Sequence, residues 1–139
     1  MYTKGRLQVQ LFLLDSIRTN NFNDERVMEK IGALWKEASR KLASHRDCIY
    51  GVYYDYASDY KGDYTLDIGI EGDGSPRLDV PDTESCRIFK VDNKDAQGLL
   101  HAWKQIWALE EAGELRRAYT FDYEKYYPSG EIEIYIALK

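Results

Sequence analysis

The sequence predicts an α+β fold in which a β-α-β-β unit occurs twice and builds one mostly antiparallel sheet, with two helices on one face. Two amphipathic stretches, residues 25–42 and 95–111, carry apolar side chains at the three- and four-residue spacing of a helix. One strand-like run precedes each stretch, and two such runs follow it. With 139 residues the chain has the length of a single compact domain, residues 1–139.

The first predicted unit begins with a strand at residues 7–14, LQVQLFLL, which alternate partly and then become continuously apolar. The stretch RTNNFND breaks that pattern, and Asn23 or Asp24 can accept hydrogen bonds from the first turn of a helix. The helix is predicted over residues 25–42. Its apolar stripe consists of Val27, Met28, Ile31, Leu34, Trp35, Ala38 and Leu42.

The two runs after this helix predict a β-hairpin. Residues 48–57, CIYGVYYDYA, and 63–73, DYTLDIGIEGD, are rich in β-branched and aromatic residues and flank a KGD turn. Residues 73–83, DGSPRLDVPDT, concentrate Gly, Pro and Asp. This composition predicts a loop that connects the two halves of the chain.

The second unit repeats the order of the first. A strand is predicted at residues 85–93, a helix at 95–111, a strand at 116–127 and, after a PSG turn, the last strand at 132–139. The apolar stripe of this helix consists of Ala96, Leu99, Leu100, Trp103, Ile106, Trp107 and Leu109.

Short residue matches support a duplication. The tripeptide Leu-Trp-Lys at 34–36 corresponds to Ala-Trp-Lys at 102–104, and Tyr-Asp-Tyr at 54–56 corresponds to Phe-Asp-Tyr at 121–123. Two such units side by side place the helices on either side of a pseudo-symmetry axis, and the sheet between them becomes the floor of a central groove. The predicted pseudo-repeats are residues 5–72 and 84–139.

Composition and charge exclude several functional classes. A net charge of −5 without clustered Lys or Arg argues against direct nucleic-acid binding. There is no apolar run of 18 residues and no signal-peptide cleavage pattern, so we expect a cytoplasmic protein without membrane association. Cys48 and Cys86 lie in apolar runs, with no CxxC motif or paired histidines nearby, which favours buried thiols over metal ligands. No metal or other cofactor is predicted.

The most informative stretch is YTFDYEKYY at residues 119–127, where Glu124 lies among aromatic residues in a chain with twelve tyrosines. Strand alternation puts Phe121 and Tyr123 on one face, and Asp122, Glu124 and Tyr126 on the other. The second face is either solvated or the wall of an aromatic pocket. In a pocket, Glu124 would suit a lipophilic cation, because rings attract cations and a neutral ligand would leave the carboxylate unpaired.

Other aromatic residues have the same two interpretations. Trp35, Trp103 and Trp107 lie on the helical stripes, where core packing is the default and pocket lining the alternative. Tyrosines crowd the first hairpin, and some of them must be exposed or line a cavity. They are Tyr53, Tyr54, Tyr56, Tyr60 and Tyr64.

Signals for catalysis are sparse. The chain has no nucleophile-elbow or phosphate-loop motif, and its two histidines, His45 and His101, lie within or at the end of helices. No catalytic residue is predicted, unless Glu124 is buried against rings. Burial would raise its carboxyl pKa and would make it a possible general base toward water.

The sequence also carries a family resemblance. The runs RTNN, KIGALW, YGVYYDYASDYKGDYTLDIGIEG, AWKQIW and RAYTFDYEKYYPSGEIEIYIALK follow one another over nearly the whole chain. In these runs the chain resembles the GyrI-like effector-binding domains, in particular the free-standing members found among integron cassette proteins. It is also similar to the ligand-binding half of multidrug-responsive transcription activators such as BmrR and Rob.

This resemblance implies a central cavity that accepts amphipathic, often cationic, compounds, with Glu124 as its acidic residue. It implies that either the alternation fails near Glu124 or the tyrosine face of the sheet is the outer one. Relatives commonly have Glu where this chain has Ala57, which removes a possible second carboxylate. The aromatic cage carries over to Trp35, Tyr53, Tyr64, Phe89, Trp103 and Tyr135.

We therefore predict a stand-alone binding domain for lipophilic cationic small molecules, with Glu124 as counter-charge. Because no helix-turn-helix precedes residue 5, transcription regulation would need a separate DNA-binding chain. One alternative, implied by the resemblance, is a hydrolase of reactive electrophilic natural products of the cyclopropanoid type, in which Glu124 directs water. Another is a protein-binding modulator of the gyrase-inhibitor type, which would show an exposed aromatic patch outside the groove.

Overall fold

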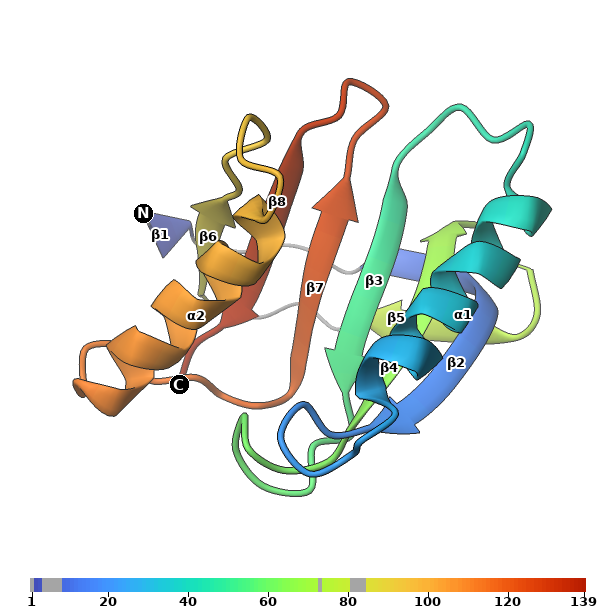
Figure 1. Ribbon diagram of the computed structural model, residues 1–139. Helices are drawn as coiled ribbons and strands as arrows, with labels where there is room; N and C mark the ends of the chain where they lie inside the picture. Colours follow the sequence, from blue (N-terminus) through green and yellow to red (C-terminus); the bar gives the residue numbers. More distant parts are fainter. Residues whose placement is uncertain (1, 4–8, 73, 81–84) are drawn as a thin grey trace.

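Figure 1 shows a computed structural model that describes residues 2–3, 9–72, 74–80 and 85–139. Two helices lie on one face of a curled antiparallel sheet. The elements in chain order are β1 (Tyr2–Thr3), β2 (Val9–Thr19), α1 (Val27–Lys41), β3 (Ile49–Tyr54), β4 (Tyr64–Glu71), β5 (Arg77–Val80), β6 (Cys86–Lys90), α2 (Gly98–Glu111), β7 (Phe121–Tyr126) and β8 (Ile132–Ala137). The predicted α+β class is confirmed.

Within the described residues, the sheet has eight strands in the order β1-β6-β8-β7-β3-β4-β2-β5. The first unit supplies β3-β4-β2 and the second supplies β7-β8-β6, so the same order runs outward from the centre on both sides. The units meet where β3 pairs with β7, from Ile49 opposite Tyr126 to Tyr54 opposite Phe121. The element order β-α-β-β therefore occurs twice, while the bounds of the pseudo-repeats remain a prediction.

The connection between the units corrects one prediction. Residues 77–80, predicted as part of a loop, form β5 and pair with β2 from Val80 opposite Val9 to Arg77 opposite Phe12. The sequence RLDV alternates polar and apolar residues, and Val80 is buried, so a short edge strand forms despite the Gly, Pro and Asp around it. Residues 73 and 81–83 of the predicted loop lie outside the described residues.

Strand β2 is longer than predicted. It continues through residues 15–19, beyond the predicted end at residue 14, and shifts register between Leu13 and Asp15. Such a shift lets a strand bend while it keeps pairing, here with β4 as far as Thr19 opposite Tyr64. Residues 7 and 8 of the predicted strand lie outside the described residues.

Both helices begin later than predicted. Asp24 accepts a hydrogen bond from the backbone N–H of Arg26, the residue before α1, rather than from within the first turn. Asp95 likewise accepts from the backbone N–H of Gln97, the residue before α2. In each case an Asp side chain closes a turn two residues on, and the helix starts only after that turn.

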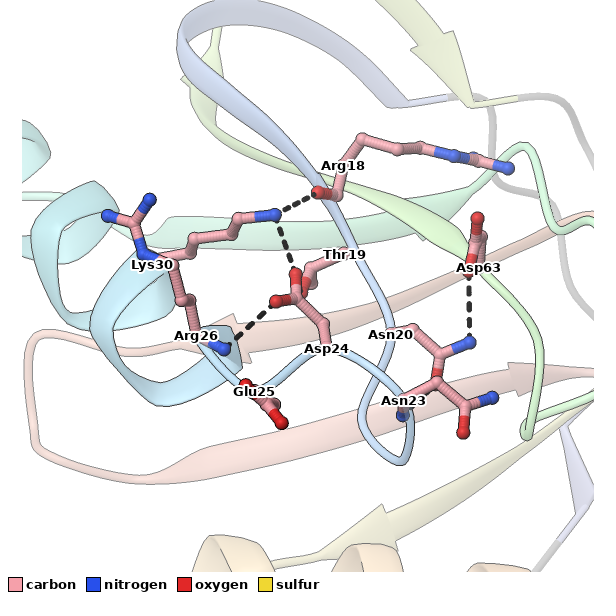
Figure 2. A pocket seen from close by; sticks show the side chains of 9 residues that line it. All are labelled: Arg18, Thr19, Asn20, Asn23, Asp24, Glu25, Arg26, Lys30 and Asp63. Atoms are coloured by element: carbon pink, nitrogen blue, oxygen red, sulfur yellow. Dashed lines mark hydrogen bonds and ion pairs between the residues drawn. The ribbon is translucent and has the colours of Figure 1, made fainter.

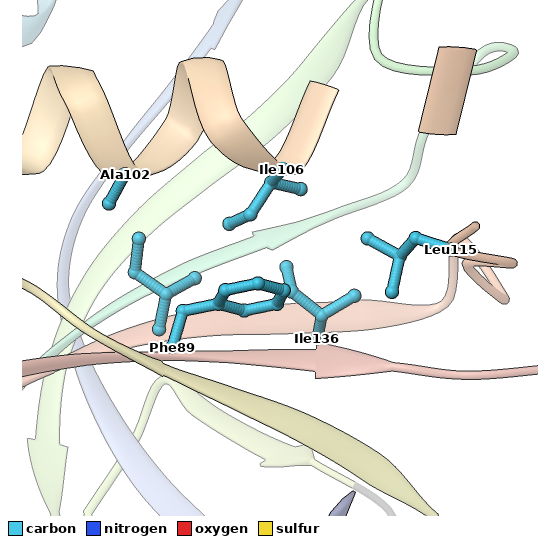
Figure 3. Close-up of a cluster of buried hydrophobic side chains, with 6 residues drawn as sticks. Phe89, Ala102, Ile106, Leu115 and Ile136 are labelled. Carbon is cyan, nitrogen blue, oxygen red and sulfur yellow. The ribbon is translucent and has the colours of Figure 1, made fainter. Parts of the chain in front are cut away.

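Separate apolar clusters lie beneath the two helices. Figure 3 shows the cluster under α2, where Ala102 and Ile106 pack on Phe89, Leu115 and Ile136. The cluster under α1 unites Leu34 and Ala38 with Tyr64, Leu66 and Ile68 of β4. Because each helix is held by its own cluster, the strands at the centre of the sheet, β3 and β7, are left between them (Figure 1).

Candidate functional site

Strand β7 places its two acidic residues on the face that carries the helices. The β3–β7 pairing runs without a register shift, so Asp122, Glu124 and Tyr126 share one face, as the alternation predicts. Asp122 is 0% exposed and Glu124 is 2% exposed. The interpretation of this face as solvated is therefore wrong, because side chains from the helices and neighbouring strands cover it. Tyr123, on the other face, stacks on Tyr135.

Three aromatic side chains donate hydrogen bonds to the Glu124 carboxylate. The Tyr53 hydroxyl and the Trp103 indole N–H donate to Oε2 at 2.8 and 2.7 Å. The Tyr126 hydroxyl donates to Oε1 at 2.6 Å. These donors come from β3, α2 and β7, so both halves of the chain build the site.

Burial dominates the electrostatics of Glu124. Desolvation raises its carboxyl pKa above the ordinary 4.5, and the hydrogen bonds from Tyr126, Trp103 and Tyr53 only partly oppose this effect. Among the described residues, no ion pair includes Glu124. Its carboxylate is thus hydrogen-bonded but has no counter-charge within ion-pair distance in this part of the chain.

Ring contacts extend the site toward α1. The Trp35 ring meets the Tyr126 ring edge-on at 4.9 Å between centroids, and the Tyr53 ring meets the Trp103 ring edge-on at 5.2 Å. Gly51 lies opposite Glu124 in the β3–β7 register, and its missing side chain leaves room for the Glu124 carboxylate and the Trp35 ring. A Cβ at this position would lie 3.3 Å from Glu124 Oε1 and 3.5 Å from the Trp35 ring. We call Glu124, Tyr53, Trp103, Tyr126 and Trp35 the inter-helix site.

The structure brings together some of the residues that the resemblance assigned to the cage. Trp35, Tyr53 and Trp103 belong to the inter-helix site. Tyr64 adjoins it, because its ring lies 5.4 Å from that of Tyr53.

Two assigned cage residues lie elsewhere. Phe89 is buried in the cluster under α2, beside Ile106 (Figure 3). Tyr135 is on the opposite face of the sheet from Glu124, where its hydroxyl donates to Glu133. Tyr126, by contrast, was not assigned to the cage, although the alternation of β7 already put it on the face of Glu124.

The second buried carboxylate of β7 has a different environment. Arg117 contacts Asp122 at 2.8 Å and Glu110 at 3.0 Å, and its side chain is 2% exposed. Asp122 also accepts the Tyr56 hydroxyl and the backbone N–H of Ala137. This carboxylate therefore has a cationic partner as well as neutral donors, which is typical of a structural network.

An open pocket of about 560 Å³ lies at the start of α1 and not at Glu124. Figure 2 shows its lining, which includes Arg18, Asp24, Lys30 and Asp63. Lys30 and Thr19 hydrogen-bond to Asp24 and lower its pKa to about 2. Because the pocket is polar and its charges are largely paired, it does not match the aromatic pocket that the sequence predicts.

The described part of the chain also bears on two other kinds of site. No three His, Cys, Asp or Glu side chains in this part of the chain gather in a way that could hold a metal ion. No helix in the same part is both long and apolar enough to cross a membrane.

Comparison with known proteins points to one family. The sequence model of the GyrI-like small molecule binding domain matches residues 16–139. No curated protein matches the chain.

Among solved structures, an integron cassette protein from the mobile metagenome of Vibrio cholerae is 25% identical, with a TM-score of 0.77 over 100% of this chain and 95% of that one. A bacterial protein assigned to transcription regulation, from Staphylococcus aureus MU50, is 10% identical, with a TM-score of 0.72 over 100% and 97% of the two chains. The protein SAV2435 bound to tetraphenylphosphonium is 11% identical, with a TM-score of 0.69 over 100% and 93%.

Proposed function

The chain belongs to the family of GyrI-like small molecule binding domains, and we propose that its ligands are amphipathic cations that bind at the inter-helix site. The observation that carries this proposal is Glu124, a buried carboxylate with three ring donors and no cationic partner among the described residues. A carboxylate in such a place is costly unless something compensates its charge.

The site offers a lipophilic cation two favourable interactions. Pairing with the carboxylate is strengthened by the exclusion of water. The rings of Trp35, Tyr53 and Trp103 add attraction of about 0.5 to 2 kcal/mol each where they face the charge. A cation with apolar substituents can make both interactions. A strongly hydrated ion would lose favourable hydration free energy when it leaves water. The tetraphenylphosphonium bound by SAV2435 is a compound of this class, which supports the proposal.

Glu124 is only 2% exposed, so side chains that include its three ring donors enclose the carboxylate. A ligand therefore reaches it only if at least one ring turns away from Glu124, and a rotating Tyr126 or Trp103 side chain meets this requirement without any change in the sheet. The energy lost with one hydrogen bond to a charged group, about 1.5 to 3 kcal/mol, must be supplied by the ligand.

Titration of the intrinsic tryptophan fluorescence with tetraphenylphosphonium tests the proposal, because Trp103 and Trp35 both lie in the site. Triphenylphosphine oxide serves as a neutral ligand of related shape. We expect saturable quenching at micromolar concentration by the cation and at least about tenfold weaker binding of the neutral compound. Equal affinity for both compounds, or no response to either, would refute the proposal.

A hydrolase is the second candidate, and one observation favours it. Glu124 has a raised carboxyl pKa, and the hydroxyls of Tyr53 and Tyr126 lie 2.8 and 2.6 Å from its oxygens. Such a carboxylate can take a proton from an attacking water while a tyrosine donates one to the leaving group. Turnover of a strained electrophile that Glu124→Gln abolishes, with binding retained, would support this activity.

A further inference from the structure

Three aromatic rings from distant segments meet beside α2. Phe22 lies in the turn between β2 and α1, Tyr60 in the turn between β3 and β4, and Trp107 in α2. The Phe22 ring lies 5.8 Å from that of Tyr60 and 5.5 Å from that of Trp107. Tyr60 and Trp107 are stacked at 5.5 Å. We call these three residues the aromatic bridge, since they connect the turn ahead of α1 to α2.

The two turns are also joined to each other and to the site. The Asn20 side-chain amide donates to the backbone carbonyl of Lys61 at 3.1 Å and to the carboxylate of Asp63 at 2.9 Å. Asn21, the neighbour of Phe22, accepts the hydroxyl of Tyr64, whose ring lies beside that of Tyr53. Movement of the turns would therefore displace the Tyr64 ring, which contacts Tyr53, a donor to Glu124.

The position of Trp107 gives the second link. It lies four residues after Trp103 on α2, so the two indoles project from the same side of the helix. Trp103 donates to Glu124, and Trp107 is covered by Phe22 and Tyr60. The aromatic bridge thus lies one turn of α2 away from the indole that donates to the buried carboxylate.

The backbone N–H groups of Phe22 and Tyr60 donate to Asn20 Oδ1 and the Tyr119 hydroxyl, but the side-chain contacts of these two residues are more exposed than those of the inter-helix site. Phe22 is 52% exposed. The Tyr60 hydroxyl and the Lys61 ammonium both contact Glu111, whose side chain is 58% exposed, and exposed pairs of this kind contribute about 1 kcal/mol or less. The turn ahead of α1 also lines the open polar pocket in Figure 2, so space beside it is already present.

The remaining contacts near the site are more firmly held. Arg117, which packs against the Trp103 ring, belongs to a buried ion-pair network with Asp122 and Glu110. Opening there would leave buried charges unpaired, which is strongly unfavourable. Between these alternatives, the two turns offer the path that costs less.

We propose that Phe22 and Tyr60 form a gate. When the two rings move away from Trp107, the gate opens and admits ligands to Glu124. This inference rests on the proposed function for the identity of the ligand, but the opening itself is a property of the protein without ligand. It assigns to Phe22 and Tyr60 a role in the rate of exchange between the inter-helix site and solvent.

Hydrogen exchange of the Trp103 indole N–H, followed by NMR, measures this opening directly without ligand, because that N–H is bonded to Glu124 inside the site. We expect Phe22→Ala and Tyr60→Ala each to accelerate the exchange at least about fivefold. The matched control is Met28→Ala, which removes another exposed apolar side chain, 79% exposed, from the neighbouring first turn of α1. The control should leave the rate within about twofold of the wild type.

The backbone amide of Ile106, in the buried core, reports global unfolding in the same spectra. Exchange of the Trp103 indole that is unchanged in both gate variants, or that rises only in proportion to the Ile106 amide, would overturn the gate. Stopped-flow binding of tetraphenylphosphonium adds a second readout: a gate predicts that association and dissociation both accelerate while Kd stays within about threefold. An accelerated dissociation alone would show a contact role and would also count against the gate. Failure of the cation to bind wild type refutes the proposed function and leaves the exchange result intact.

Discussion

Replacement of Glu124 by Gln removes the negative charge from the inter-helix site while it keeps the size of the side chain. The carbonyl of the introduced glutamine can take the place of Oε2 and accept from Tyr53 and Trp103. Its amide group would then lie at the place of Oε1, where the Tyr126 hydroxyl can rotate and accept. We therefore expect the hydrogen-bond geometry to survive and the charge alone to be lost.

The loss in cation affinity follows from the electrostatics of the site. Two unit charges about 4 Å apart interact by about 4 kcal/mol at an effective dielectric constant of about 20, which sets an upper bound. Part of that energy is spent on the ring donor that the ligand displaces from the carboxylate. We expect Glu124→Gln to weaken the binding of tetraphenylphosphonium by at least about 1.4 kcal/mol, or about tenfold. The affinity for a neutral ligand should change little.

The pH dependence has a defined sign. Burial raises the folded-state pKa of Glu124 above its unfolded value, so this carboxyl contributes most to stability below the unfolded pKa, near 4.5, and the contribution is lost as pH rises through the folded pKa. Cation affinity should change in the opposite direction and rise with pH over the same window, because the cation needs the ionised form. In Glu124→Gln the rise of cation affinity with pH should be absent, and the dependence of stability on pH should lose the part that Glu124 contributes.

Fluorescence titration from about pH 5 to about pH 8, together with urea denaturation at the same pH values, measures both effects. The matched control is Glu133→Gln, on β8, which changes net charge equally but lies on the opposite face, where Glu133 also accepts tyrosine hydroxyls. If the two variants weaken cation binding to the same extent, the loss of affinity results from the change in overall charge. The site-specific reasoning would then be refuted.

Three further substitutions test the surroundings of the site and its supports. Gly51→Ala places a Cβ 3.3 Å from Glu124 Oε1, so cation affinity should fall at least about threefold in the same titration. Arg117→Met leaves the carboxylate of Asp122 buried without its cation and should cost about 3 to 5 kcal/mol in urea denaturation. Ile106→Ala, at a position with 0% exposure under α2, should cost about 2 to 5 kcal/mol in that assay through the cavity it leaves.

The sequence predicted the elements with strong periodicity and missed those without it. Both helices have a sustained apolar stripe, so their existence was predictable, whereas their first residues depended on Asp side chains that cap turns instead of helices. The edge strand β5 has only four residues within a Gly- and Pro-rich stretch, so composition outweighed its alternation. The two-residue strand β1, which pairs with β6, carries too few residues for any pattern.

The candidate site shows the same division. Alternation along β7 placed Glu124 and Tyr126 on one face, but only the packing of the helices decides that this face is buried. In β8, the pattern Ile-Glu-Ile-Tyr-Ile already groups Tyr135 with Glu133 and separates it from Ile134, the residue opposite Glu124. For Tyr135 the family resemblance was therefore a poorer guide than the strand period.

The Arg117–Asp122 pair could not be predicted from spacing. Tyr119, between them, has a left-handed backbone conformation with φ of 57°, which no strand pattern implies. The resulting change in chain direction allows the Arg117 guanidinium to contact Asp122, five residues along the chain. A regular strand would instead have put these two side chains on opposite faces.

The contrast between Asp122 and Glu124 is the strongest argument that the second of them has a function. Both carboxylates are buried on the same face of the same strand, two residues apart, so the fold imposes a similar desolvation cost on each. The chain compensates Asp122 with an arginine of its own, whereas the described residues give Glu124 only neutral donors. A glutamine could satisfy those donors without a charge, so stability alone does not account for a glutamate. The charge gains a purpose if its partner arrives from outside the chain, and the lipophilic cation that we propose as ligand has both the charge for Glu124 and the apolar surface for the aromatic rings.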